Sequence, residues 1–260
     1  QWQGGLGFDN AEGYSQAPKT YTKPTYANPA LPESALNYLL GQRKLTSAVL
    51  ERNKIGFKDG WINFPYYKKG EVVNVKSRNG KKEFRQIAGC EKTVYKFDDI
   101  QDTTIFCEGE IDALSCDVAT GHNNSISAPD GAKGYTFFKS VEKAFEGVTR
   151  LLICVDNDEH GKQLEAELLK RVGSHKCLRV VLPDGIKDAN QCLVEHGAEM
   201  LKVCLDNPIP YPVEGVYYLA DVDLRSYYEN GDQEGISTGY RNIDPFFKLE
   251  KDAGQLITVT

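Results

Sequence analysis

The sequence lacks the marks of membrane, secreted and zinc-ribbon proteins. No apolar run in its 260 residues approaches the roughly 20 residues that a membrane helix needs, and no signal-peptide pattern opens it. The seven cysteines include no Cys-x-x-Cys pair, and the four histidines stand at no ligand spacing from them. These absences predict an intracellular protein with reduced thiols, no membrane segment and no structural zinc.

What is present is the composition of a globular protein, with 40% hydrophobic and 26% charged residues. The length suffices for one large or two ordinary domains. Because the first residue is Gln rather than Met, we expect a segment of a longer protein. The net charge of −6 excludes a uniformly basic surface for nucleic acid.

Positive charge is nevertheless concentrated in one stretch. Between Tyr67 and Phe97 there are nine Lys and Arg residues and three Glu residues, and nine minus three gives a local charge of +6. Aromatic residues such as Trp61 and Phe84 are interleaved with them, a mixture that can hold single-stranded nucleic acid. The alternative is the solvated edge of a small sheet, with lysines guarding the edge and aromatic residues in the core.

The first part of the chain predicts a linker and then a small α+β unit. Residues 1–30 show no apolar period and are expected to form a flexible linker. Residues 32–40 and 45–54 have the pattern of short helices. Residues 61–67, 72–76 and 84–87 have strand patterns, and turn signals at Lys69-Gly70 and Asn79-Gly80 favour antiparallel hairpins.

From residue 103 the pattern alternates between strands and helices, which is typical of βαβ units and a mostly parallel sheet. The expected strands are 103–107, 125–128, 151–155 and 178–182, and the expected helices are 111–119, 138–145, 162–172 and one from 188. Three prolines within 207–212 then predict an end to regular structure and a domain boundary. Beyond it we expect a helix at 218–228, a flexible joint at 229–235 and a strand at 254–260.

Acidic residues follow three of these strands. Glu108 follows strand 103–107, Asp156 and Asp158 follow strand 151–155, and Asp188 follows strand 178–182 through a short turn. The carboxyl ends of parallel strands meet at one edge of a sheet, so we expect these side chains to converge. Four carboxylates need cations to remain ionised together, and oxygen ligands favour Mg²⁺ or Mn²⁺. Such ions usually serve phosphoryl transfer.

A simpler interpretation of such acids is capping of helix N-termini. For Asp156 and Asp158 taken alone, the two interpretations are evenly matched. For Glu110 and Asp112, early in the helix after Glu108, capping is the favoured interpretation.

Three motifs, in this order, resemble the Toprim domain of primases and type IA topoisomerases: Glu108-Gly-Glu-Ile-Asp112, Asp156-x-Asp158 before Gly161, and Lys187-Asp-Ala-Asn190. Over residues 32–260 the resemblance is strongest to the primase half of phage-type primase-helicases and their Twinkle relatives. It implies an α/β fold, in which a small α+β basic subdomain with antiparallel strands precedes a mostly parallel Toprim sheet with flanking helices. The implied domains are a linker (1–30), the basic subdomain (31–100), Toprim (101–207), and a linker helix with the truncated start of a RecA-like helicase domain (208–260).

The resemblance also implies roles. Glu108 matches the Toprim glutamate that acts as general base or acid. Asp156 and Asp158 match the paired metal ligands, and Asp188 matches the later acidic residue that helps to hold metal and nucleotide. Basic residues that would contact template and nucleotide phosphates are Arg78, Lys82, Arg85 and Lys92. The implied function is a DNA primase core that joins ribonucleoside triphosphates into RNA primers on single-stranded DNA, using Mg²⁺ or Mn²⁺.

Two departures from the family pattern bear on this expectation. No Cys-rich zinc domain precedes the basic subdomain, and the chain ends before a phosphate-binding loop begins. The implied partners are therefore the DNA template, the nucleotides and a hexameric helicase domain in the same full-length chain. Two alternatives stay open: a non-catalytic single-stranded-DNA-binding or spacer module of a replicative helicase, and a Toprim nuclease with the same metal site.

Overall fold

The computed structural model describes residues 20–131, 134–212, 237–239 and 241–242. The helix expected at 218–228, the joint at 229–235, the strand at 254–260 and residues 1–19 of the expected linker lie outside the described residues. The described residues from 20 to Tyr211 belong to one compact unit, and Pro212 begins a second. Within the described ranges, no helix combines the length and the apolar character needed to cross a membrane.

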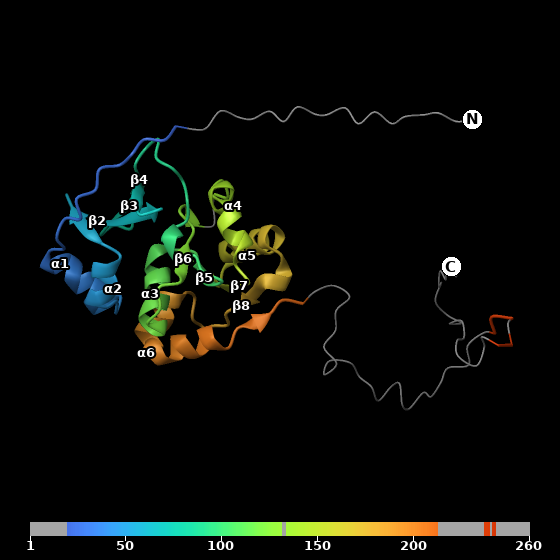
Figure 1. Cartoon of the computed structure of the whole chain (residues 1–260). Coiled ribbons are helices and arrows are strands. Elements are labelled where there is room, and N and C mark those ends of the chain that lie inside the picture. The colour runs from blue at the N-terminus through green and yellow to red at the C-terminus, as the bar shows by residue number, and fades with distance from the viewer. Residues whose placement is uncertain (1–19, 132–133, 213–236, 240, 243–260) are drawn as a thin grey trace, which may run out of the picture. The chain divides into compact units, whose positions relative to one another are not determined.

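The N-terminal part combines short helices with an antiparallel sheet (Figure 1). α1 (Glu33–Leu36) runs into the π-helical turn η1 (Asn37–Gln42), so the expected helix continues past Gly41. α2 (Ser47–Arg52) begins at Thr46, whose hydroxyl accepts a hydrogen bond from the Val49 N–H. The sheet has the order β1-β2-β3-β4, with β1 (Gly56–Lys58), β2 (Trp61–Lys68), β3 (Glu71–Asn79) and β4 (Phe84–Gln86).

Both expected hairpin turns form. Lys69 and Gly70 have φ angles of 55° and 76°, and a type I′ turn requires positive values at both positions. At the second turn, the Asn79 side-chain oxygen accepts hydrogen bonds from the N–H groups of Lys81 and Glu83, both 3.0 Å long. β1 is not predicted, because its residues Gly56-Phe-Lys58 show little of the pattern that is typical of a strand.

The second sheet has the order β6-β5-β7-β8-β9. Its first four strands are parallel, which confirms the mostly parallel α/β sheet. They are β5 (Thr103–Cys107), β6 (Ser125–Ser127), β7 (Arg150–Cys154) and β8 (Cys177–Arg179). β9 (Ile209–Pro210) adds an antiparallel edge within the proline-rich stretch where the sequence predicts no regular structure. An edge position tolerates a proline because its missing N–H group need not pair.

Helices cover both faces of this sheet, because successive strand residues point to opposite sides. Ile105 and Leu152 pack with α3 (Glu110–Thr120) and α6 (Ala189–Asp206) on one face. Phe106 and Ile153 pack with α4 (Phe138–Glu146) and α5 (Glu159–Val172) on the other. The short 3₁₀ turns η2 (Phe97–Asp99) and η4 (Ser174–Lys176) connect these elements.

The N-terminal part shares its core with the α3 and α6 side of the parallel sheet. Leu39, Leu50 and Phe64 belong to the same buried cluster as Leu114 of α3 and Leu193 of α6. The described residues of the expected linker, 20–30, have no regular structure but contact this part, where the Thr22 N–H donates to the Gly89 carbonyl at 2.9 Å. The antiparallel sheet therefore shares a core with α3 and α6.

Candidate functional site

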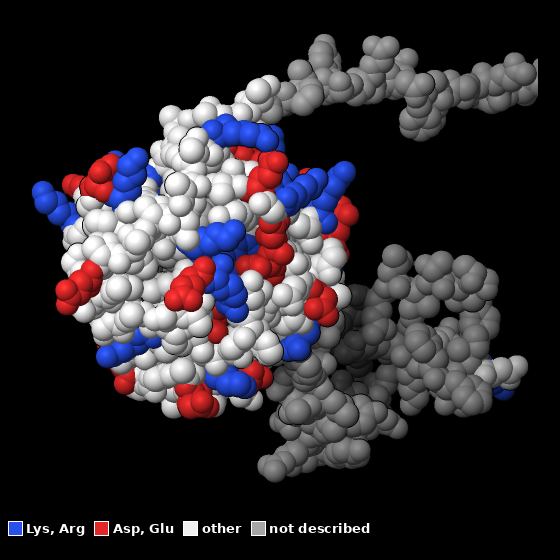
Figure 2. Space-filling model, turned by 60° about the vertical axis from the view of Figure 1, so that its left-hand side comes forward, with Lys and Arg blue, Asp and Glu red and all other residues white. Residues whose placement is uncertain are grey.

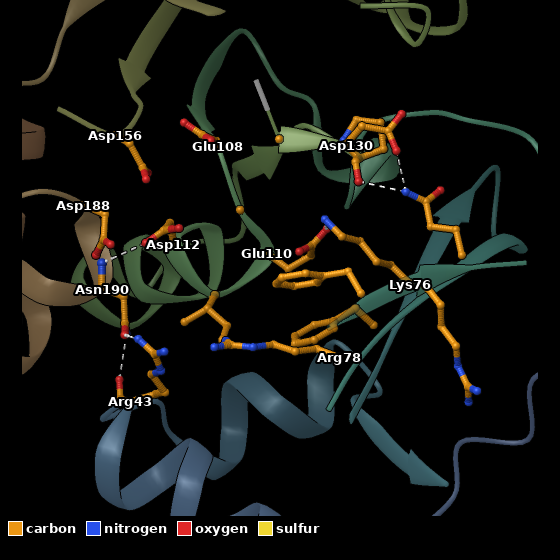
Figure 3. A pocket seen from close by; sticks show the side chains of 18 of the residues that line it. Arg43, Lys76, Arg78, Glu108, Glu110, Asp112, Asp130, Asp156, Asp188 and Asn190 are labelled. Atoms are coloured by element: carbon orange, nitrogen blue, oxygen red, sulfur yellow. Dashed lines mark hydrogen bonds and ion pairs between the residues drawn. The ribbon is translucent and has the colours of Figure 1, made fainter. Parts of the chain in front are cut away.

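Four carboxylates converge on one cavity at the carboxyl edge of the parallel sheet. Glu108 follows β5, Asp156 follows β7, Asp188 precedes α6 and Asp112 lies in the first turn of α3. Figure 3 shows their side chains directed toward one another. All four line a cavity of about 680 Å³, which also has Lys76, Arg78 and Arg85 from the antiparallel sheet in its wall. This volume is within the range of sites for nucleotide-sized ligands.

Two of the predicted acids also cap helices. Asp188 accepts a hydrogen bond from the Gln191 N–H at 2.7 Å at the start of α6. Asp158 accepts bonds from the N–H groups of His160 and Gly161, both 3.0 Å, at the start of α5. Capping and site formation are therefore not exclusive at these positions, since each cap bond uses only the Oδ1 atom.

A lysine joins Asp156 to Asp158. The Lys187 ammonium lies 3.1 Å from Asp156 Oδ2 and 3.0 Å from Asp158 Oδ2. Asp158 does not itself line the cavity, but Lys187 does. The two carboxylates raise the pKa of Lys187 well above its usual value. The sequence places Lys187 in a motif but gives no sign that it bridges the pair.

Burial and mutual repulsion raise the pKa values of the two inner carboxyls. For Asp112 burial is the largest cause, followed by the charges of Asp188 and Asp156. For Asp156 burial also acts first, and Lys187 opposes it. The pKa of Asp158 is lowered instead, mainly by the Gly161 N–H and by Lys187. The inner part of the site is therefore short of positive charge.

Asp112 is the acid whose place in this cluster the sequence does not indicate. Its early position in α3 is typical of helix caps, and capping is what the pattern favours. In the structure its Oδ1 accepts a hydrogen bond from the Asn190 N–H at 3.0 Å, which ties α3 to α6 beside Asp188. Asp112 lies four residues after Glu108, in the first turn of the helix that follows it, and this closeness in the sequence is the signal that could have included it.

Two glycines allow the backbone to approach the acids closely. A Cβ atom at Gly161 would stand 1.9 Å from the Asp156 carbonyl oxygen, which no side chain permits. A Cβ at Gly131 would lie 3.4 Å from Glu108 Oε1, and Gly131 has a φ of 59°. The Gly161 of the sequence motif is therefore required by packing behind Asp156.

Three of the four predicted basic residues line the same cavity, namely Arg78, Arg85 and Lys92. Lys82 lines a neighbouring cavity of about 740 Å³, which shares Arg78 with the first. Lys92 is paired with Asp130 at 2.8 Å. The Arg85 guanidinium lies 4.1 Å from the centre of the Trp61 ring, a cation-π distance.

Arg78 is the most buried of these four. It is 9% exposed, lies 5.4 Å from the Tyr38 ring centre and 5.7 Å from that of Phe84, and forms no ion pair within the described ranges. Burial lowers its pKa, partly offset by nearby Tyr38, Glu110 and Asp112. A buried cation without a bonded anion indicates a place where an anionic ligand binds favourably.

Other lysines of the basic stretch are engaged internally. Lys76 lies 2.8 Å from Glu110 Oε1, to which the Tyr66 hydroxyl also donates. Lys68 pairs with Glu91 and Lys96 with Asp117. On the face shown in Figure 2, Lys and Arg side chains are interspersed with Asp and Glu. The basic stretch therefore contributes single residues to the cavity, and much of its charge is neutralised locally.

Asn190 connects the acidic and basic walls. It is 1% exposed. Its side-chain oxygen accepts from Arg43 Nη1 at 2.9 Å, and its amide nitrogen donates to the Arg43 carbonyl and to Ser115 Oγ, both at 2.9 Å. This network, partly visible in Figure 3, fixes the N-terminal helical segment against α3 and α6.

The donors fit a hard divalent cation. All the candidate ligands at this edge are carboxylate oxygens, which Mg²⁺ and Mn²⁺ prefer. The pKa values of Asp112 and Asp156 are raised, and the Lys187 ammonium lies between Asp156 and Asp158. Both observations indicate that a cation would be stabilised here.

Comparisons with known proteins agree with this architecture. A family model described as Toprim-like matches residues 105–193. Among curated proteins, the chain is 31% identical over 248 residues to the "Twinkle homolog protein, chloroplastic/mitochondrial" of Arabidopsis thaliana, covering 84% of this chain and 35% of that protein. It is 33% identical over 198 residues to the "Primase homolog protein" of the same plant, covering 66% and 58%. The chain thus spans about a third and somewhat over half of these relatives.

Solved structures show the same fold. The primase fragment of the bacteriophage T7 primase-helicase superposes with a TM-score of 0.58 at 19% identity, covering 73% of this chain and 81% of that one. The Aquifex aeolicus primase, with its zinc-binding and RNA polymerase domains, gives a TM-score of 0.56 at 14% identity, covering 68% and 56%. Together with the fold, these matches show that the chain belongs to the Toprim primase family, of the Twinkle and phage type.

Proposed function

We propose that this chain is the catalytic core of a DNA primase, which joins ribonucleoside triphosphates into short RNA primers on single-stranded DNA. The observation that carries the proposal is a single cavity with carboxylates on one wall and arginines on the other. Phosphoryl transfer needs both: acids that hold divalent metal, and cations that hold phosphates. The relatives named primase and Twinkle support the same reading.

The acids would divide the chemistry between them. Asp156, Asp158 and Asp188 would hold Mg²⁺ or Mn²⁺, and Asp112 joins them as a ligand or as a partner that tunes their charge. Divalent metal, when bound, supplies Lewis-acid stabilisation of the transferring phosphoryl group. Glu108 would accept the proton of the attacking 3′-hydroxyl, as a general base on the same edge. Lys187 would hold the two aspartates in place until the cation binds.

The opposite wall would bind the nucleotide. Arg78 offers a planar guanidinium that lies near two aromatic rings and forms no ion pair within the described residues, so a triphosphate oxygen can bind it without first breaking one. Arg85 and Lys92 would contact template or triphosphate at the cavity rim, and Lys82 would act in the neighbouring cavity. Lys92 must leave Asp130 to do so, which makes Arg78 the stronger candidate.

The wider arrangement is part of the same proposal. The chain would act inside a cell or organelle, with residues 31–100 as the basic subdomain, 101–207 as the Toprim domain, and the remainder leading into a hexameric helicase domain of the full-length protein. Its partners would be the single-stranded template and the nucleotides.

Primer synthesis on single-stranded DNA tests the proposal. The chain is incubated with template, labelled ribonucleotides and Mg²⁺, and we expect short labelled RNA. Glu108→Gln and Asp158→Ala should abolish synthesis while the circular dichroism spectrum is retained. Glu199→Gln, at an exposed position of α6, is the matched control and should retain synthesis.

Each alternative function predicts a different result in this assay. Cleaved template would identify a Toprim nuclease with the same metal site. Retained DNA binding with neither primers nor fragments would identify a binding or spacer module. Undiminished synthesis by Glu108→Gln or Asp158→Ala would refute the assigned roles.

A further inference from the structure

Three cysteines meet behind the acidic edge. Cys107 ends β5, Cys154 ends β7 and Cys116 lies in α3, and all three are buried in one core cluster. Their sulfur atoms lie within 4.8 Å of one another, and the Cys107 and Cys116 sulfurs are 3.6 Å apart. The proposed primase chemistry uses none of them.

The spacing of these sulfurs suits a soft metal ion. Zinc-sulfur bonds are about 2.3 Å long, so two thiolates on one tetrahedral ion stand roughly 3.8 Å apart. The Cys107 to Cys116 separation already has this value to within a few tenths of an ångström, and small side-chain rotations would bring in Cys154. The sequence does not reveal the group, because its members come from two strands and a helix.

We propose that Cys107, Cys116 and Cys154 form a binding site for one Zn²⁺ ion, separate from the carboxylate site. Thiolates select soft ions over Mg²⁺ and Mn²⁺, so the two sites would not compete. On binding, the three thiols release three protons to solvent, and the ion leaves the group with a net charge of −1. A monovalent soft ion would leave −2, which an apolar core disfavours more strongly.

Such an ion would brace the acidic edge. Cys107 directly precedes Glu108, Cys154 lies two residues before Asp156, and Cys116 lies one helical turn after Asp112. A metal shared by the three sulfurs therefore crosslinks the three elements that carry these acids. We expect Zn²⁺ to raise the melting temperature without itself touching substrate.

Zinc binding is tested on the whole chain, reduced with a phosphine and freed of metal. Zn²⁺ is titrated in excess Mg²⁺, which occupies the carboxylates, and X-ray absorption at the zinc edge identifies the ligands. We expect one equivalent bound, with a shell of three sulfurs at about 2.3 Å. A first shell of only oxygen or nitrogen overturns the proposal, and this measurement needs no variant.

Two variants separate this site from other thiols. Cys116→Ser should weaken Zn²⁺ binding at least about tenfold, since it removes one of three ligands. Cys177→Ser, at a cysteine that is also buried but lies outside the group, should bind as the wild type does. Equal affinity of Cys116→Ser and wild type would overturn the proposal.

Discussion

Replacing Lys187 with Met should tighten Mg²⁺ binding, although it removes a cation from a site proposed to bind polyphosphate. In the structure the Lys187 ammonium contacts Asp156 at 3.1 Å and Asp158 at 3.0 Å. A divalent ion bound by this pair must displace the ammonium or share the carboxylates with it. Met keeps the length of the side chain and removes only the charge, so the carboxylates become available without new steric conflict.

The size of the effect follows from exposure. The Lys187 side chain is 52% exposed, while those of Asp156 and Asp158 are 16% and 38% exposed. Solvent-screened ion pairs contribute about 0.2–1 kcal/mol each, so the two together contribute roughly 1 kcal/mol. Mg²⁺ affinity should therefore rise about fivefold in the variant, because 1.4 kcal/mol corresponds to tenfold. The metal-free variant should lose roughly 1 kcal/mol of unfolding free energy.

Isothermal titration with Mg²⁺, without nucleotide, measures the first effect, and urea denaturation without metal measures the second. Lys170→Met, at an exposed position of α5, is the control and should change neither. Unchanged or weaker Mg²⁺ binding in Lys187→Met would show that the carboxylate pair is not where the cation binds.

Three further predictions concern the same site. Because the pKa values of Asp112 and Asp156 are raised, protons compete with Mg²⁺ for these carboxylates up to a pH above the usual aspartate range. Mg²⁺ affinity should therefore rise with pH over this range, and the heat of titration should depend on the buffer because protons are released. A heat that does not depend on the buffer would contradict this. Gly161→Ala should lower the free energy of unfolding, measured by urea denaturation, by more than about 3 kcal/mol, because its Cβ would overlap a backbone oxygen. Gly41→Ala, where a Cβ would have nothing within 4 Å, should be neutral or slightly stabilising, and equal effects of the two substitutions would refute the packing argument. Asn190→Ala removes three side-chain hydrogen bonds of a buried residue and should cost about 2–3 kcal/mol. A loss below about 0.5 kcal/mol would show that the network is not structural.

The sequence predicts the parallel sheet well because its signals are local. The run Leu151 to Cys154 is apolar, and a buried parallel strand must be so on both faces. The turn at Lys69 and Gly70 is signalled by Gly70, which adopts a positive φ angle without steric cost. The short β1 and β9 escape prediction, because the strands they pair with determine them and their own residues show little pattern.

The same distinction between local and long-range signals decides which site residues the sequence predicts. Glu108 and Asp156 can be placed at one edge because each follows a parallel strand, whereas Asp188 comes after a longer connection between β8 and α6. The sequence does not predict which residues Asp112 and Lys76 contact. These contacts depend on how distant parts of the chain, such as the antiparallel sheet and α3, pack together, and no local sequence pattern encodes that packing. The roles of the site residues therefore stay predictions until variants are measured.

Helix capping and the proposed metal binding would support one another at this edge. The two N–H groups at the start of α5 hold Asp158 Oδ1, which leaves Oδ2 directed at Lys187. The same bonds lower the pKa of Asp158, so this carboxylate remains ionised at a pH where the buried Asp112 and Asp156 still retain protons. A cation arriving at the site would therefore meet one preoriented, charged ligand at its exposed side first. Its charge would then favour ionisation of the inner pair, so that the inner carboxylates become ligands only when the metal is present.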